Sequence, residues 1–139
     1  MIFKKLSIAI LFMCIGVSVS AQELSNKQKL REKNKVEKFS PKEKDSMQMW
    51  FHNETKKLGL SPDTLEKYNS ILTDNVFKIR RLNDKDQKNT SAEVAKKFDA
   101  LVEKTNVQVK PLLTDEQYKM HLKNFGALAD AARKKRMPE

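Results

Sequence analysis

Cysteine and glycine are scarce in this chain, and their scarcity excludes several kinds of chemistry. The one cysteine, Cys14, lies within an apolar run near the N-terminus, so the rest of the chain has no disulfide, no thiolate metal site and no cysteine nucleophile. Glycine occurs only three times in 139 residues, and the chain contains neither a phosphate-binding glycine loop nor a nucleophile elbow. We therefore expect a protein that is not an enzyme, with no catalytic residue and no bound cofactor.

Long hydrophobic runs are absent except near the N-terminus. Two lysines precede an apolar run over residues 6–19, and Val19-Ser20-Ala21 then provides a small-x-small cleavage site. This pattern predicts a secretory signal peptide over residues 1–21. A membrane anchor is the competing interpretation, but about 14 apolar residues fall short of the roughly 20 that span a bilayer. A lipid anchor on Cys14 would require a small preceding residue, and Met13 is bulky.

Apolar residues and negative charge are also in short supply after this leader. Without the two leader lysines, 26 basic and 18 acidic residues remain, a net charge of +8. Only about a third of the remaining residues are apolar, which favours thin helical layers or a dimer that shares apolar surface. A basic surface usually suggests nucleic acid. Export argues against that partner and leaves anionic lipid head groups, cell-envelope polymers and acidic polypeptides.

Strand signals are missing, whereas apolar residues recur at helical spacing. No segment shows the strict alternation or the turn dipeptides of a β-hairpin. Apolar residues instead recur every three or four positions between helix start and stop signals. The sequence therefore predicts an all-α domain over residues 40–136, preceded by a flexible basic arm, mobile or frayed, over residues 22–39. The four predicted helices run from Ser40-Pro41 to Gly59, from Pro62 to about Asp84, from Thr90 to Pro111 and from Asp115 to Arg136.

Two of the predicted helix starts share a pattern. In Leu113-Thr114-Asp115-Glu116-Gln117, the threonine can cap the helix and Gln117 can complete a capping box. Leu60-Ser61-Pro62-Asp63-Thr64 repeats the pattern, with Ser61 as the cap and Thr64 in the place of the glutamine. These residues have a structural role in this interpretation, so no active residue is assigned among them.

The leader, the four helices and the two boxes of the form Leu-Thr-x-x-Gln resemble the Spy and CpxP family of periplasmic proteins, over roughly residues 40–136. The resemblance implies an extended four-helix hairpin or cradle that forms an antiparallel homodimer. Spy-like members act as ATP-independent chaperones for unfolding envelope proteins, and CpxP-like members damp a stress-sensing kinase. Other relatives bind zinc or sense metals through histidines. This chain departs from the family's pattern at Thr64 and Pro111.

Aromatic and basic residues on the first two predicted helices are the candidate contacts for a partner. If the first helix lies at a rim, its rings beside two lysines form an apolar surface bordered by positive charge. Such a surface suits transient capture of unfolded chains. Core packing of the rings and a merely solvated basic face are the alternatives. The candidates are Trp50, Phe51, Lys56, Lys57, Lys78, Arg80 and Arg81.

Metal binding is a further alternative. His52 and His121 are the two histidines, and Met49 falls three residues before His52 on the same helical face, a pair that copper accepts. A stripe of Met, Trp and Phe at helical spacing is ordinarily packing surface, however, and no dense cluster of ligands is visible. We therefore predict no metal site.

Taken together, the patterns predict a periplasmic chaperone or stress-related binding protein that holds partially unfolded envelope polypeptides and is not embedded in a membrane. The alternative is a metal-responsive or regulatory envelope protein that docks a sensor partner. A third possibility is a small interaction protein whose arm, residues 22–38, attaches it to an acidic surface.

Overall fold

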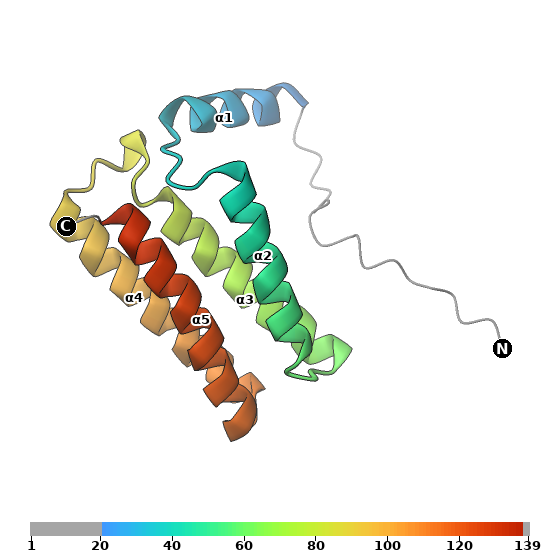
Figure 1. Ribbon diagram of the computed structural model, residues 1–139. Helices are drawn as coiled ribbons and strands as arrows, with labels where there is room; N and C mark the ends of the chain where they lie inside the picture. The colour runs from blue at the N-terminus through green and yellow to red at the C-terminus, as the bar shows by residue number, and fades with distance from the viewer. Residues whose placement is uncertain (1–20, 138–139) are drawn as a thin grey trace. The chain divides into compact units, whose positions relative to one another are not determined.

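The computed structural model describes residues 21–137, and these residues form an all-α structure, as the sequence predicted (Figure 1). Within this range there is no β-strand, and no helix is both long enough and apolar enough to cross a bilayer. The predicted signal peptide, residues 1–21, lies outside the described residues except for Ala21, and Cys14 lies outside them too. The elements are α1 (Ala21–Asn34), α2 (Pro41–Lys56), α3 (Pro62–Arg81), η1 (Lys85–Gln87), α4 (Ser91–Val109), η2 (Lys110–Leu112) and α5 (Asp115–Arg136).

The chain divides into two units, with the boundary between Lys33 and Asn34. In the first unit, the described residues form most of α1, a polar helix with basic residues in its last turn. The arm predicted for residues 22–39 is therefore helical as far as Asn34, and its mobility stays a prediction. The second unit holds all the later elements and two clusters of buried apolar residues.

Three helices of the second unit begin with capping boxes, at starts that the sequence predicted. In each box, the N-cap hydroxyl accepts a hydrogen bond from the N–H of the third helical residue, whose own side chain accepts one from the N-cap N–H. These bonds satisfy donors that the helix itself leaves unpaired, so the start of each helix is specified locally. The pairs are Ser40 with Glu43 in α2, Thr90 with Glu93 in α4, and Thr114 with Gln117 in α5.

Helix α3 begins with half of such a box. Ser61 Oγ accepts a hydrogen bond from the Thr64 N–H at 3.3 Å and donates one to Thr64 Oγ1 at 2.9 Å. The threonine hydroxyl is thus occupied by the cap hydroxyl and does not reach the Ser61 N–H. Pro62 fills the first helical position, where its missing N–H leaves no helix bond unmade. The first motif keeps its cap but loses the reciprocal bond.

The two clusters of buried apolar residues lie mainly along α3, α4 and α5. Helix α3 packs along α4, and α5 packs against both α2 and α4. Helix α2 contributes only Thr55 to the buried residues of the second unit, and Leu58 follows just after the helix ends. The first cluster is Leu58, Tyr68, Leu72, Val109 and Phe125, and the second is Ile79, Leu82, Val94, Phe98 and Ala129.

Two helix ends can be compared with the predicted boundaries. Gly59 adopts φ +65° just after α2, the left-handed conformation that glycine accepts without a steric penalty, so the predicted stop is confirmed. Helix α3 ends at Arg81 instead of near Asp84. The buried Asp84 carboxylate accepts hydrogen bonds from the Val36 N–H and from Arg81 Nε, both at 3.2 Å. These bonds hold Asp84 in the turn after the helix.

Candidate functional site

The aromatic pair Trp50 and Phe51 lies on α2, and its two rings have different surroundings. Trp50 is 40% exposed, and Met49 beside it is 67% exposed. Phe51 is partly buried and packs against the first cluster, with its ring centre 6.5 Å from that of Trp50. Phe51 therefore attaches α2 to the core, while Met49 and Trp50 form an apolar edge that faces solvent.

Two exposed lysines, Lys56 and Lys57, follow this apolar edge at the end of α2. Lys57 Nζ lies 2.7 Å from Glu54 Oε1, an exposed pair of the kind that contributes little to stability. Lys56 forms no ion pair with any residue in the described range. The structure thus places positive charge six and seven residues after Trp50, at the last residue of α2 and at the residue that follows it.

The basic residues at the end of α3 divide into two kinds. Lys78 and Arg80 have exposed side chains. Arg81 instead forms ion pairs with Asp86 and Asp84 across the turn after α3, and these carboxylates raise the pKa of its guanidinium. The Arg81 charge therefore stabilises this turn and is less available to a partner than the charges of Lys78 and Arg80.

The two motifs meet beside the first cluster. Leu60 and Leu113, the residues that precede the two caps, are partly buried and pack against this cluster. Gln117 does more than complete its capping box, because its Nε2 donates a hydrogen bond to the buried Leu58 carbonyl at 3.0 Å. That bond joins the start of α5 to the connection between α2 and α3.

His121 is fully buried and has hydrogen-bond partners on both ring nitrogens. Nδ1 lies 2.8 Å from Tyr68 Oη, and Nε2 lies 2.9 Å from Asn106 Oδ1. Because the amide oxygen can only accept, Nε2 carries the proton and Nδ1 accepts from the tyrosine hydroxyl. Burial lowers the pKa of His121 to about 4, so the ring is neutral at neutral pH. This histidine offers no free nitrogen to a metal.

His52, the other histidine considered as a metal ligand, lies exposed on α2. Met49 is exposed on the same helix. Nowhere in residues 25–137 do three or more His, Cys, Asp or Glu side chains gather in a way that could hold a metal ion. His52 is therefore not part of such a group.

Arg136, the last residue of α5, is a candidate that the sequence pattern did not single out. It is 8% exposed, and its Nη1 donates to Asn83 Oδ1 at 3.0 Å and to the Arg80 carbonyl at 3.4 Å. Its buried Nε has no hydrogen-bond partner in the part of the chain that the structure describes. Burial, together with the nearby Arg80 charge, lowers the pKa of Arg136. In the sequence it is one of four consecutive basic residues at a helix end, and nothing there separates it from its exposed neighbours.

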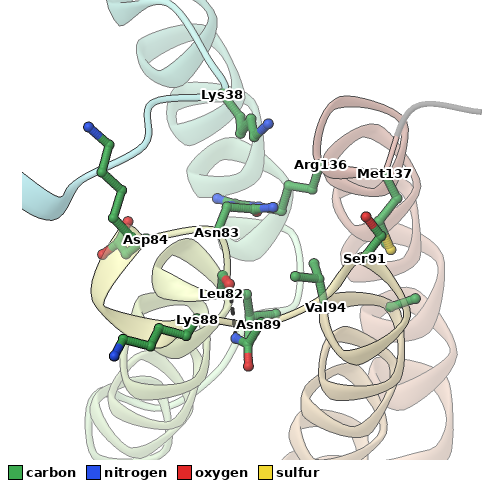
Figure 2. Close-up of a pocket in the computed structure, with 12 residues that line it drawn as sticks. Lys38, Leu82, Asn83, Asp84, Lys88, Asn89, Ser91, Val94, Arg136 and Met137 are labelled. Atoms are coloured by element: carbon green, nitrogen blue, oxygen red, sulfur yellow. Dashed lines mark hydrogen bonds between the residues drawn. The ribbon is translucent and has the colours of Figure 1, made fainter.

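A pocket of about 540 Å³ lies beside Arg136 (Figure 2). Its wall comes from the turn between α3 and α4, the first turn of α4, the end of α5 and the segment before α2. Figure 2 shows the Arg136 side chain extending between Lys38 and Asn83. The turn itself is held by Asn89, whose Nδ2 donates to the Leu82 carbonyl at 3.0 Å.

Comparisons with known proteins return no match. No model of a known protein family matches the chain, and no curated protein and no solved structure matches it either. The functional argument therefore depends on the residues and contacts of this chain.

Proposed function

We propose that this protein is an exported periplasmic binding protein that holds partially unfolded envelope polypeptides without nucleotide, as an ATP-independent chaperone in a stress response. The observation that carries the proposal is the exposed apolar edge of α2. Met49 and Trp50 are large apolar side chains, 67% and 40% exposed, and Lys56 and Lys57 follow them at the end of the same helix. Exposed apolar side chains rimmed by charge are typical of surfaces that bind other proteins.

The mechanism follows from the balance of charge and apolar area. The net charge of +8 that remains without the leader attracts acidic segments of a client over a distance and speeds encounter. Shallow contacts with Met49 and Trp50 then hold apolar segments that a folded client would bury. Because these contacts cover little area, the client can leave and fold. No bond is made or broken, so neither a catalytic group nor a cofactor is required.

The proposal includes an antiparallel homodimer with an extended four-helix hairpin or cradle in each protomer. Two further apolar side chains support a shared surface, because Val107 on α4 is 59% exposed and Leu122 on α5 is 40% exposed. Analytical ultracentrifugation of the chain from Gln22 onward tests this part. We expect twice the protomer mass, and a monomer at high concentration would contradict the dimer without affecting client binding.

The chaperone proposal is tested by mixing the purified protein with an aggregating client in the absence of ATP and following light scattering. We expect stoichiometric protein to suppress aggregation, and the double substitution Met49→Gln with Trp50→Gln to abolish most of this effect. Leu30→Gln is the matched control, because it removes an exposed apolar side chain from α1 instead of α2. Unchanged aggregation with the original protein would overturn the proposal.

A further inference from the structure

Arg136 is a buried cation that forms no ion pair with a carboxylate among the described residues, although Asp84 and Glu37 lie near enough for their charges to raise its pKa against the effect of burial. Its Nη1 hydrogen bonds go to two neutral oxygens, Asn83 Oδ1 and the Arg80 carbonyl, and its Nε has no partner among residues 25–137. It forms no ion pair with any residue of the described range, although it is only 8% exposed. Burying an unpaired charge is costly, and the loss is recovered when an opposite charge binds beside it.

The pocket next to Arg136 has a surplus of positive charge. Its lining contains four cationic side chains, those of Lys38, Lys85, Lys88 and Arg136, and one carboxylate, that of Asp84. None of the three lysines forms an ion pair within residues 25–137. The Asp84 carboxylate accepts two hydrogen bonds, one of them from Arg81, which lies outside the lining, and its charge also acts on Arg136. The wall of the pocket therefore carries a net charge of +3.

The start of α4 adds to this positive character. Ser91, the first residue of this 19-residue helix, lines the pocket. The capping box occupies the N–H groups of Thr90 and Glu93, and the N–H groups of the first two helical residues have no partner within the helix. The positive end of the helix dipole therefore faces the same space as Arg136.

We propose that this pocket binds a phosphate group, carried either by a soluble molecule or by a lipid head group. A phosphate monoester brings up to two negative charges and three strong acceptor oxygens, which match one guanidinium and several ammonium groups. The pocket volume of about 540 Å³ exceeds what a phosphate group needs, so the group that carries the phosphate also enters. Leu82, Val94 and Met137 supply an apolar part of the wall for that carrier.

This site is separate from the apolar edge of α2. The phosphate-binding proposal can therefore be tested independently of the chaperone proposal. The test is an NMR titration of the chain from Gln22 onward at low ionic strength. The signals observed are the backbone amides and the Arg136 Nε–H. The probes are inorganic phosphate, glucose 6-phosphate, and phosphatidylcholine vesicles with and without phosphatidic acid. Sodium chloride at matched ionic strength is the reference.

We expect saturable shifts at Arg136 Nε–H and around Lys88 and Ser91 with a phosphate probe and not with chloride. A response to glucose 6-phosphate assigns a soluble ligand, and a response limited to phosphatidic acid vesicles assigns a lipid head group. Shifts that are equal with chloride, or that do not saturate with any phosphate probe, would overturn the proposal.

Variants then locate the site. Arg136→Gln should weaken binding at least about tenfold, a loss typical of a charge-assisted contact. If that buried substitution impairs folding, the double substitution Lys38→Gln with Lys88→Gln removes two other positive charges that line the pocket and should also weaken binding. Lys134→Gln, an exposed neighbour in the last turn of α5, removes the same charge and should leave affinity within about twofold. Equal losses in Lys134→Gln and in the pocket variants would contradict a defined site.

Discussion

Tyr68 on α3 and His121 on α5 share a buried hydrogen bond of 2.8 Å, although they lie 53 residues apart in the chain. The histidine ring also stacks on Phe125, with ring centres 5.3 Å apart, and its other nitrogen meets Asn106 on α4 at 2.9 Å. One buried polar chain therefore joins the three helices that form most of the core. Both polar ends of the imidazole are satisfied, which is the condition for burying it.

Tyr68→Phe should destabilise the protein by about 1–3 kcal/mol, because it leaves the buried Nδ1 of His121 without a donor. Urea unfolding followed by circular dichroism measures the loss. Tyr118→Phe is the matched control, since Tyr118 stacks on the same imidazole but its hydroxyl has no hydrogen bond in the described range. We expect that control to stay within about 0.5 kcal/mol of the original protein. Equal losses in both variants would refute the role assigned to the Tyr68 hydroxyl.

Stability should fall as the pH is lowered from about 6.5 to about 4. Burial lowers the pKa of His121 from 6.5 to about 4, so between these values the unfolded chain binds a proton that the folded protein does not. The contribution of the neutral histidine is therefore complete above pH 6.5 and is lost on acidification, by on the order of 3 kcal/mol for a shift of this size.

The control for this pH dependence is His121→Gln, whose amide offers one acceptor and one donor without titrating. Its unfolding free energy should be nearly independent of pH between 6.5 and about 4.5, the range in which the comparison is made. Glu37 interferes only below about pH 4.5, because its ion pairs with Lys35 and Lys44 lower the pKa of its carboxyl from 4.5 to about 2, and its contribution to stability is lost between these values. An identical slope in the original protein and in His121→Gln would contradict the assignment.

Gln117→Glu should cost about 1 kcal/mol, even though glutamate also completes a capping box. The exchange keeps the acceptor for the Thr114 N–H but removes the Nε2 donor that reaches the Leu58 carbonyl. The reverse exchange Glu93→Gln in the α4 box is the control, because the Glu93 side chain makes no long-range hydrogen bond in the described range. Thermal unfolding should show a lower midpoint for the first variant only.

Trp50 should report client binding directly, because it is the one tryptophan of the chain and is 40% exposed. We expect its fluorescence to shift to shorter wavelength when an unfolded client covers it, and not with the same client in its folded state. Raising the salt concentration to about 1 M shortens the screening length to roughly 3 Å, so association should slow markedly. A binding rate that is indifferent to salt would contradict the proposed long-range attraction.

The sequence predicted the helices closely, because helix starts and stops are local. A hydroxyl at the N-cap and an acceptor three residues later satisfy the first N–H groups whatever the rest of the chain does. The starts at Ser40, Thr90 and Thr114 and the stop at Gly59 are accordingly confirmed. The end of α3 was predicted too late, because hydrogen bonds to Asp84 from Val36 and Arg81 decide it.

What the sequence determined by itself is an all-α chain with its helix starts, its surplus of positive charge and its limited apolar content. Tertiary structure decided whether individual side chains that look alike in the sequence are buried or exposed. His121 is buried while His52 is exposed, and Phe51 packs while Trp50 faces solvent. Arg136 is buried while Lys134 and Lys135 are exposed. The physical reason is that burial depends on which distant helix lies against a residue, and local spacing specifies only the face of the helix.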